Sequence, residues 1–469
     1  MIPLHHSKGS IYAVFGLARS GLAAARALVR GGAEVRVWDD NAASRLVAEQ
    51  AGFKPLPLND ATLSGCAALV LAPGVPLTHP APHDCVAAAA RVGVPVIGDI
   101  ELLLREMRPA ANDIGVYGVT GTNGKSTTTA LLAHVLNAAG REIAMGGNIG
   151  VPVLELPRLA AQGSAYLLEM SSFQIDLTPG WQARIAVLLN ITPDHLDRHG
   201  DMARYAAIKA RIFAGQGAGD TAIIGLDDEY CRAIHAALLA EASGRQIIGI
   251  SAERVLAEGI SAVAGKLYEN GTEIAELARF PALPGKHNGQ NIAAVYAAAR
   301  TAGLDAASIL KAVESFPGLK HRLQQLGKVD GIACVNDSKA TNAEAAEKAL
   351  ACYDGIYWIA GGKAKEGGIA PLKPLFPRIR HAFLIGAAAA DFAATLGEAV
   401  PHTISGNLEQ AVAQGLDMAR RDHAAGTAGD AVLLLSPACA SYDQFKSFEH
   451  RGEEFIRLIQ QRQARGEAA

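Results

Sequence analysis

The residues best suited to chemistry lie in the segment Gly118-Val-Thr-Gly-Thr-Asn-Gly-Lys-Ser-Thr127. An apolar run precedes it and a helical pattern follows, which predicts a strand, a glycine-rich turn and a helix beginning near Lys125. Glycines let backbone N–H groups close around phosphates, and a helix amino terminus favours anions. Lys125 would reach the β- and γ-phosphates of a nucleotide, and the Ser126 hydroxyl could ligate Mg²⁺. The segment departs from the general G-x-x-x-x-G-K-[ST] form, because Val119 occupies the position of the first glycine.

Two further polar segments could complete a metal site. Glu169 opens the sequence Glu-Met-Ser-Ser-Phe-Gln after an apolar run, and a carboxylate there could enter a Mg²⁺ shell. Asp194-His-Leu-Asp-Arg-His199 holds two histidines four residues apart, which is also a zinc-binding spacing on a helix. A phosphate-transfer site would use Mg²⁺ instead. Lys209 bears on the choice between zinc and Mg²⁺, because a lysine with a depressed pKa can react with CO₂ to give a carbamate that ligates metal. The simpler interpretation of Lys209 is an exposed lysine on a helix.

A partial dinucleotide-binding pattern lies near the amino terminus. Gly16 and Gly21 are separated by four residues after an apolar run, and Asp39 follows the next expected strand. Ala18 replaces the middle glycine of the fingerprint. The pattern therefore disfavours NAD and leaves another diphosphate as the expected ligand.

Two polar loops follow apolar runs in the last third of the chain. They are Asn336-Asp-Ser-Lys-Ala-Thr-Asn342 and Ser436-Pro-Ala-Cys-Ala-Ser-Tyr-Asp-Gln-Phe445. Taken alone, each could be a helix N-cap. Cys439 is flanked by alanines with no identifiable base, which indicates packing rather than nucleophilic catalysis.

The elements that must hold these segments alternate between short apolar strands and Ala-rich helices, which predicts parallel α/β sheets. Breaks at 108–113 and at Pro317-Gly318 divide the chain into domains 1–107, 108–318 and 319–469. We expect a Rossmann-like first domain, a central P-loop ATPase-like domain and a Rossmann-like third domain. Expected strands include Ile11–Phe15, Glu34–Trp38, Ile114–Val119, Tyr166–Glu169, Ile185–Asn190, Thr221–Gly225, Ile332–Asn336 and Ile356–Ala360. The polar segments follow these strands, where open α/β sheets bind ligands.

Bulk composition excludes several classes of function. The 469 residues carry 43 Lys and Arg against 46 Asp and Glu, and no basic run stands out. We therefore expect no nucleic-acid partner and no acidic-membrane partner. No signal peptide and no apolar run long enough to span a membrane is visible. The six cysteines form no Cys-x-x-Cys pair, which favours reduced thiols and a cytoplasmic location.

Taken together, the motifs resemble those of the Mur ligases, in family order from about Ile11 to Gly452. Besides the segments above, the resemblance rests on Gly147-Asn-Ile-Gly150, Gly285-Lys-His-Asn-Gly-Gln-Asn291 and His321-Arg322. It implies three α/β domains that bind a nucleotide sugar, ATP and an amino acid. The two loops of the last third point to the family member that adds D-glutamate to UDP-N-acetylmuramoyl-L-alanine.

The resemblance also implies roles for individual residues. It places ATP on Gly121, Thr122, Asn123, Gly124, Lys125, Ser126, Thr127, Asn288, Asn291, Arg322, Asp337 and Lys339. One Mg²⁺ would bind Ser126 and Glu169, and a second would bind His195 and carbamylated Lys209; the catalytic residues would be Lys125, Glu169, His195 and Lys209. The UDP-sugar substrate would contact Arg19, Ser20, Asp39 and Asn148, and glutamate would contact Thr341, Lys365, Ser441, Tyr442 and Phe448.

The implied activity is an ATP-dependent, ADP-forming amide ligation through an acyl phosphate, in cytoplasmic peptidoglycan precursor synthesis, by a monomer. Sibling Mur ligases and folylpolyglutamate synthases are alternatives that share the ATP loop but lack the two loops of the last third. A non-catalytic, nucleotide-gated regulatory protein would have lost metal or transfer residues, yet each expected one is present. A metabolite kinase would not need an acyl-acceptor domain.

Overall fold

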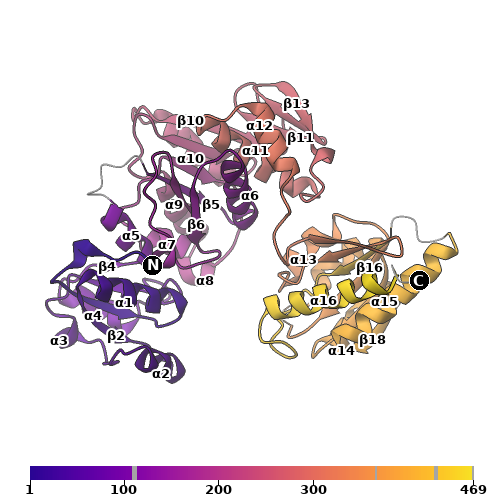
Figure 1. The fold of residues 1–469 in the computed structure, drawn as a ribbon, viewed down its shortest axis with the longest axis horizontal. Helices are drawn as coiled ribbons and strands as arrows, with labels where there is room; N and C mark the ends of the chain where they lie inside the picture. Colours follow the sequence, from indigo (N-terminus) through magenta and orange to yellow (C-terminus); the bar gives the residue numbers. More distant parts are fainter. Residues whose placement is uncertain (108–113, 365–366, 427–430, 467–469) are drawn as a thin grey trace. The chain divides into compact units, whose positions relative to one another are not determined.

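The computed structural model describes residues 1–107, 114–364, 367–426 and 431–466. The expected linker at 108–113 and the expected glutamate ligand Lys365 lie outside the described residues. The chain forms two compact units, of which one comprises Met1–Arg279 with Gly289–Val313, and the other Phe280–Asn288 with Glu314–Ala469. Together they contain three sheets (Figure 1).

The first sheet is parallel, in the order β2-β1-β3-β4. Its strands are β1 (Ile11–Phe15), β2 (Glu34–Trp38), β3 (Ala68–Leu71) and β4 (Val96–Ile97), and its helices are α1 (Arg19–Gly31), α2 (Ala42–Gln50), α3 (Asp60–Leu63), α4 (Asp84–Arg91) and α5 (Asp99–Met107). Gly16 and Gly21 both permit close packing, since a Cβ on Gly21 would come within 1.8 Å of the Gly16 carbonyl oxygen. The partial fingerprint therefore forms the tight strand-to-helix turn that its spacing predicts.

The second sheet has nine strands in the order β13-β12-β11-β10-β9-β8-β5-β7-β6. They are β5 (Gly115–Thr120), β6 (Ile143–Gly147), β7 (Ala165–Glu169), β8 (Ile185–Leu188), β9 (Thr221–Gly225), β10 (Gln246–Ser251), β11 (Ile260–Val263), β12 (Lys266–Glu269) and β13 (Thr272–Glu276). Its helices are α6 (Lys125–Ala138), α7 (Ser172–Asp176), α8 (Leu196–His199), α9 (Met202–Ala210), α10 (Glu229–Ala240), α11 (Lys286–Thr301) and α12 (Ala306–Glu314). The seven strands from β6 across the sheet to β11, β5 included, pair in parallel. At the other edge of the sheet, β12 pairs antiparallel with β11 and with β13.

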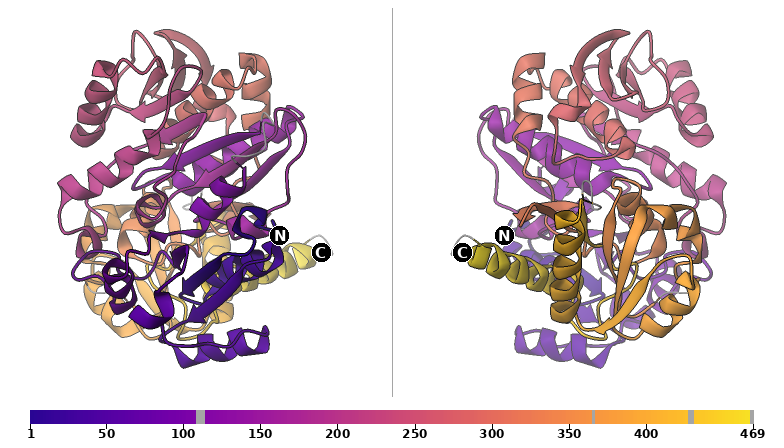
Figure 2. Two further views of the ribbon diagram at one scale, coloured as in Figure 1. Left: turned by 90° about the vertical axis from the view of Figure 1, so that its left-hand side faces the viewer. Right: turned by 90° about the vertical axis from the view of Figure 1, so that its right-hand side faces the viewer.

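The third sheet has the order β14-β15-β19-β16-β17-β18. Its strands are β14 (Gln324–Val329), β15 (Ile332–Asn336), β16 (Ile356–Gly361), β17 (Ile379–Ile385), β18 (His402–Gly406) and β19 (Val432–Leu435), and its helices are α13 (Ala343–Leu350), α14 (Ala389–Leu396), α15 (Leu408–Ala424) and α16 (Phe448–Gly466). Along β16, Trp358 packs in one apolar core and Ile359 in another, so both faces are covered. Helix α16, at the yellow end of the chain, lies along this sheet (Figure 2).

The predicted α/β class with parallel-sheet domains is confirmed. Strands β1, β2, β9 and β15 have the predicted bounds, because at least three of the five residues in each are apolar. The antiparallel edge β11 to β13 was not predicted, since its strands are short and the polar residues of β12 and β13 weaken the apolar signal. No helix in the described part of the chain is long and apolar enough to cross a membrane.

Candidate active site

Strand register brings the central motifs to one edge of the nine-stranded sheet. Val119 of β5 pairs with Glu169 of β7, which in turn pairs with Gly147 of β6. On the other side of β5, Thr120 pairs with Leu188 of β8. Because these strands are parallel, the residues that follow them leave the sheet side by side at its carboxyl edge.

The glycine-rich loop between β5 and α6 has the backbone of a phosphate cradle. Gly121 has φ +153° and Gly124 has φ +85°, conformations that L side chains rarely adopt. A Cβ on Gly124 would also come within 2.2 Å of Asn291 Oδ1. The Lys125 ammonium lies over this loop, donating to the carbonyl oxygens of Gly121 at 2.9 Å and Thr122 at 2.7 Å. Ser126 and Thr127 are buried in the first turn of α6.

Two residues that sequence reasoning missed hold this loop in place. Asn190 accepts from the Thr122 N–H through its carbonyl oxygen and from the Asn123 N–H through Oδ1, both at 2.8 Å. Its Nδ2 donates to Gln290 Oε1 at 2.8 Å, on the same helix as Asn291. Asn190 follows β8 in the expected strand Ile185–Asn190, so its position after a strand was the one available signal.

Glu169 is a buried carboxylate of which one oxygen is unpaired. Oε1 accepts a hydrogen bond from Asn148 Nδ2 at 2.7 Å, while Oε2 is buried without a partner. A buried carboxylate oxygen costs free energy when it has neither a hydrogen bond nor a metal. Glu169 Oε2 is therefore suited to be the ligand of a cation. Mg²⁺ needs only one or two protein oxygens, since it keeps several waters and takes substrate phosphates. The residues present therefore fit Mg²⁺.

Lys209 is a buried lysine beside the same loop. Its side chain is fully enclosed, and Nζ donates to the Gly121 carbonyl oxygen at 2.9 Å and to Thr120 Oγ1 at 3.4 Å. Burial, with a further contribution from the charge of Lys125, holds the pKa of Lys209 well below its usual value. A lowered pKa raises the share of the neutral amine, which is the form that reacts with CO₂.

The two histidines of the Asp194–His199 segment have different environments. His199 is buried, bonded through Nε2 to Ser172 Oγ at 2.9 Å and stacked on Phe173. Burial lowers the pKa of His199 to about 4. His195 has φ +53°, is half-exposed and has Asp194 at 3.3 Å. Among the described residues no three His, Cys, Asp or Glu side chains gather as a metal site. The His199 ring is thus used in packing. A zinc site on this segment would need both His195 and His199 as ligands, so the environment of His199 disfavours zinc.

In the first sheet, the residues expected to hold the nucleotide sugar follow β1 and β2. Asp39 Oδ2 accepts from the Leu17 N–H at 2.6 Å, which ties the end of β2 to the turn after β1. Arg19 is exposed, and its Nη2 lies 3.5 Å from the Gly150 carbonyl oxygen in the loop that contains Asn148. Ser20 is partly exposed in the first turn of α1.

In the third sheet, the two polar loops lie together after β15 and β19. Asp337 Oδ2 accepts from Ser436 Oγ at 2.8 Å, and Oδ1 accepts from the Leu323 N–H at 3.2 Å. Burial raises the pKa of Asp337 to about 7. The Lys339 ammonium lies 4.5 Å from the centre of the Phe448 ring.

The other expected ligands of the third sheet differ in exposure. Ser441 is buried, Thr341 and Arg322 are partly buried, and Tyr442 is 73% exposed. Asn288 is grouped with the second unit, whereas Asn291, on the same helix, belongs to the first.

Comparison with known proteins gives consistent matches. A family model described as "Mur ligase middle domain" matches residues 119–299. A UDP-N-acetylmuramoylalanine--D-glutamate ligase of Rhizobium meliloti is 51% identical, with 97% of each chain covered. The protein of that name from Nitrobacter winogradskyi is 50% identical, with 98% of each chain covered. The chain belongs to the Mur ligase family.

Solved structures of Mur ligases share the fold at low identity. The UDP-N-acetylmuramate-alanine ligase of Thermotoga maritima has a TM-score of 0.56 and 16% identity, covering 96% of this chain and 99% of that one. A D-alanyl-D-alanyl-adding ligase of Acinetobacter baumannii has a TM-score of 0.57 and 17% identity, covering 98% and 92%. These likenesses support the three-domain Mur ligase fold.

Arg451 is a further residue of this Mur ligase that the sequence did not single out. Its fully buried guanidinium donates to Ser338 Oγ at 3.0 Å, to the Ser338 carbonyl oxygen at 2.9 Å and to the Cys439 carbonyl oxygen at 3.0 Å. It therefore bonds to both polar loops of the third sheet. An arginine within a charged helical terminus gives no sequence signal for that position.

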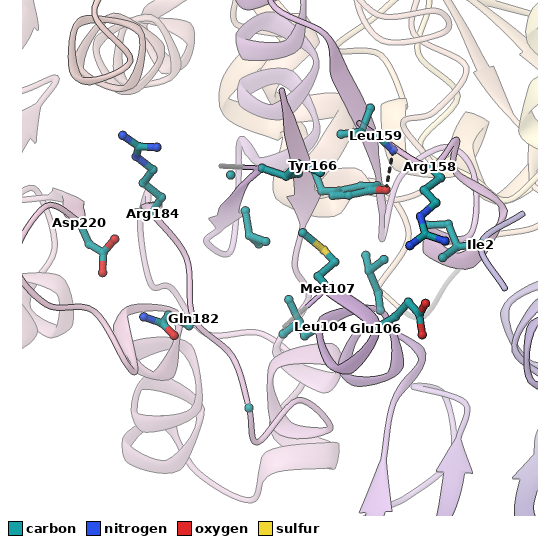
Figure 3. A pocket seen from close by; sticks show the side chains of 15 residues that line it. Ile2, Leu104, Glu106, Met107, Arg158, Leu159, Tyr166, Gln182, Arg184 and Asp220 are labelled. Carbon is teal, nitrogen blue, oxygen red and sulfur yellow. Dashed lines mark hydrogen bonds between the residues drawn. The ribbon is translucent and has the colours of Figure 1, made fainter. Parts of the chain in front are cut away.

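A cavity of about 360 Å³ lies away from this site (Figure 3). Gly115 and Val116, at the amino end of β5, line it together with Leu104, Met107 and Tyr166. Because the glycine-rich loop follows the opposite end of β5, this cavity is not the nucleotide site.

Proposed function

We propose that the chain catalyses the ATP-dependent, ADP-forming addition of D-glutamate to UDP-N-acetylmuramoyl-L-alanine. The observation that carries this proposal is identity of about half of all positions, over nearly the full length, to ligases that bear this activity in their names. The buried Glu169, the buried Lys209 and the glycine-rich loop lie at one sheet edge, which supports phosphoryl transfer there.

For ATP, we propose that residues 121–127 bind the phosphates and that Lys125 turns from the loop carbonyls to the transferring phosphoryl group. Backbone N–H groups at the start of α6 would favour the anion. The remaining contacts would come from Asn288, Asn291, Arg322, Asp337 and Lys339. Four of these belong to the second unit, so the proposal requires residues of both units to contact the same ATP during the reaction.

For Mg²⁺, we propose two sites, one on Ser126 and Glu169 and the other on His195 and carbamylated Lys209. When bound, the ions would neutralise charge on the transferring phosphoryl group. The low pKa of Lys209 supports carbamylation, because the amine must be neutral to attack CO₂. Asn148 would keep the Glu169 carboxylate oriented through its hydrogen bond.

The reaction would proceed in two steps. The alanine carboxylate of the muramoyl substrate attacks the γ-phosphate of ATP, which gives an acyl phosphate and ADP. The deprotonated amine of D-glutamate then attacks the acyl carbon, and phosphate leaves. Lys125 would neutralise developing negative charge in the first step, and His195 would orient the acyl phosphate in the second.

The outer substrate contacts follow the same division into domains 1–107, 108–318 and 319–469. Uridine diphosphate would meet Arg19, Ser20 and Asp39, and the muramoyl group would meet Asn148. Glutamate would be bound by Thr341, Lys365, Ser441, Tyr442 and Phe448. We place the reaction in the cytoplasm and in a monomer; the six free cysteines are consistent with a reducing compartment.

The experiment that tests this function is phosphate release from ATP and Mg²⁺ with UDP-N-acetylmuramoyl-L-alanine and a panel of single amino acids. Release only with D-glutamate, and only with the muramoyl substrate, is the expected result. Release with L-glutamate or another amino acid would move the chain to a sibling activity. No release from folded protein that still binds ATP would overturn the ligase proposal.

A further inference from the structure

Arg198, on α8, makes specific contacts with the first domain. Its Nη1 donates to the Gly74 carbonyl oxygen at 2.7 Å, and its Nη2 donates to the Val75 carbonyl oxygen at 2.9 Å. Gly74 and Val75 lie in the loop just after β3, at the carboxyl edge of the first sheet. That edge is where an open parallel sheet binds its ligand.

The same guanidinium also contacts the central site. Its carbon lies 4.8 Å from the centre of the Phe173 ring. Phe173 belongs to α7, which begins three residues after Glu169, and the His195 ring lies 5.0 Å from it. One aromatic ring is therefore shared by Arg198 and by the histidine assigned to the second Mg²⁺.

The geometry requires arginine in particular. Two N–H donors of one guanidinium meet two successive carbonyl oxygens while its carbon lies over an aromatic ring, which a lysine ammonium cannot do at once. The Arg198 Nε is buried and has no hydrogen-bond partner, so the side chain is held in place although one N–H is unsatisfied. If this position served only to pack against Phe173, an apolar side chain would fill it without burying an unsatisfied N–H.

We propose that Arg198 is a positioning residue that holds the His195 loop in register with the loop after β3, through Phe173. The inference rests on the proposed function, because it assigns the β3 loop to the nucleotide-sugar side of the site and His195 to the metal side. Arg198 itself touches no reacting atom. It sets the distance between the carboxylate to be activated and the groups that stabilise phosphoryl transfer.

The test compares Arg198→Ala and Arg198→Lys with Arg204→Ala as a matched control. Arg204 is exposed and reaches the same first-domain loop through Thr78 Oγ1 at 2.7 Å, but it lies on α9. For Arg198→Ala we expect kcat to fall roughly 10- to 100-fold, the effect of a misplacement near 1 Å. The KM for ATP should change less than about twofold, because the glycine-rich loop does not involve Arg198.

Three further readouts separate positioning from general destabilisation. Methylguanidine in solution should restore part of the activity of Arg198→Ala, and Arg198→Lys should remain as impaired as Arg198→Ala. In the protein without ATP, Mg²⁺ or substrate, hydrogen exchange should accelerate in residues 72–79 and 170–176 of Arg198→Ala. Arg204→Ala should keep wild-type kcat and wild-type exchange at 170–176.

The outcomes distinguish this proposal from the proposed function. Wild-type protein without ligase activity would overturn the function, while the exchange comparison would still test the contact. If the wild type is active, and Arg198→Ala has the kcat and the hydrogen exchange of the wild type, the proposed role of Arg198 is overturned. Full activity in Arg198→Lys would also overturn it, because charge alone would then suffice.

Discussion

The amide of Asn148 donates to the Glu169 carboxylate at 2.7 Å and leaves the other carboxylate oxygen buried and unpaired. Asn148 follows β6 and Glu169 is the last residue of the adjacent strand β7, so strand register sets this distance. A single hydrogen bond thus distinguishes the two oxygens of Glu169 and leaves Oε2 as the one that could ligate the proposed Mg²⁺.

The first prediction concerns this hydrogen bond. In Asn148→Ala the carboxylate loses its orientation, so we expect kcat/KM to fall about 10- to 100-fold and the half-saturating Mg²⁺ concentration to rise. The control is Asn137→Ala, since Asn137 is exposed and its Oδ1 accepts from the Ile143 N–H at the start of β6. A higher KM for the muramoyl substrate with an unchanged Mg²⁺ requirement would show that Asn148 acts on substrate alone.

Carbamylation of Lys209 gives a second prediction. Burial holds the pKa of Lys209 well below its usual value, which raises the share of neutral amine that can react with CO₂. Exhaustive dialysis against CO₂-free buffer should lower activity, and bicarbonate should restore it. Protein loaded with ¹³C-bicarbonate should show a carbamate resonance that is missing from Lys209→Arg and retained in Lys311→Arg, an exposed control. Full activity of Lys209→Arg would contradict this role.

The glycine-rich loop gives a third prediction, in which two glycines are compared. Gly124→Ala places a Cβ 2.2 Å from Asn291 Oδ1, whereas Gly140→Ala, at the far end of the same helix, meets nothing within 4 Å. Both glycines have positive φ, +85° and +76°, so backbone strain is shared. We expect a loss of ATP affinity of at least about tenfold in Gly124→Ala only, measured by calorimetry. An equal loss of ATP affinity in the two variants would show that backbone strain, and not the contact with Asn291, causes the loss.

Asp337 gives a prediction about pH. Its pKa is about 7 in the folded chain and near 3.9 when unfolded, so the folded state binds the proton more tightly. Its contribution to stability is present below about pH 4 and is lost as the pH rises to 7, by up to about 4 kcal/mol. The stability of wild type relative to Asp337→Asn should therefore fall between pH 4.5 and 7.5, as measured by calorimetry. A difference that does not depend on pH would contradict the raised pKa.

Arg451 gives a prediction about stability. Arg451→Met leaves two carbonyl oxygens and a hydroxyl of the third domain without their donor, so we expect its free energy of unfolding to fall by about 2–4 kcal/mol. Arg457→Met, on the same helix, loses only an exposed pair with Glu454 and should unfold like wild type. Denaturant unfolding measures both. Equal stability of the two variants would show that the polar loops do not depend on Arg451.

Local sequence predicted much of the fold because its signals are short-range. The run Ile11–Phe15 and the run Ile332–Asn336 became strands with those bounds, and the helix after the glycine-rich loop begins at Lys125. Each of these elements is specified by apolar periodicity and by glycines at its boundary. The same logic predicts a ligand-binding role for the polar loops after the strands, since parallel sheets bind ligands at their carboxyl edge, and that role stays a prediction.

The contacts of Asn190, Gln290, Arg198 and Arg451 were outside the reach of sequence reasoning, although Gln290 and Arg198 lie within motifs of the sequence. Each acts through partners far along the chain, as when Arg198 bonds to Gly74, 124 residues away. An arginine or asparagine has the same local pattern whether it is solvated or clamped between loops. The contact that gives it a role exists only after the sheets have packed.

The sequence by itself determined the parallel α/β class, the glycine-rich strand-to-helix loop and the membership in the Mur ligases, because these depend on residue type and spacing. Only the tertiary structure decided that His199 is a packing residue with a low pKa, that Lys209 is buried, and that one oxygen of Glu169 is unpaired. Burial and hydrogen bonding between distant segments set these properties, and no local pattern of residues encodes them.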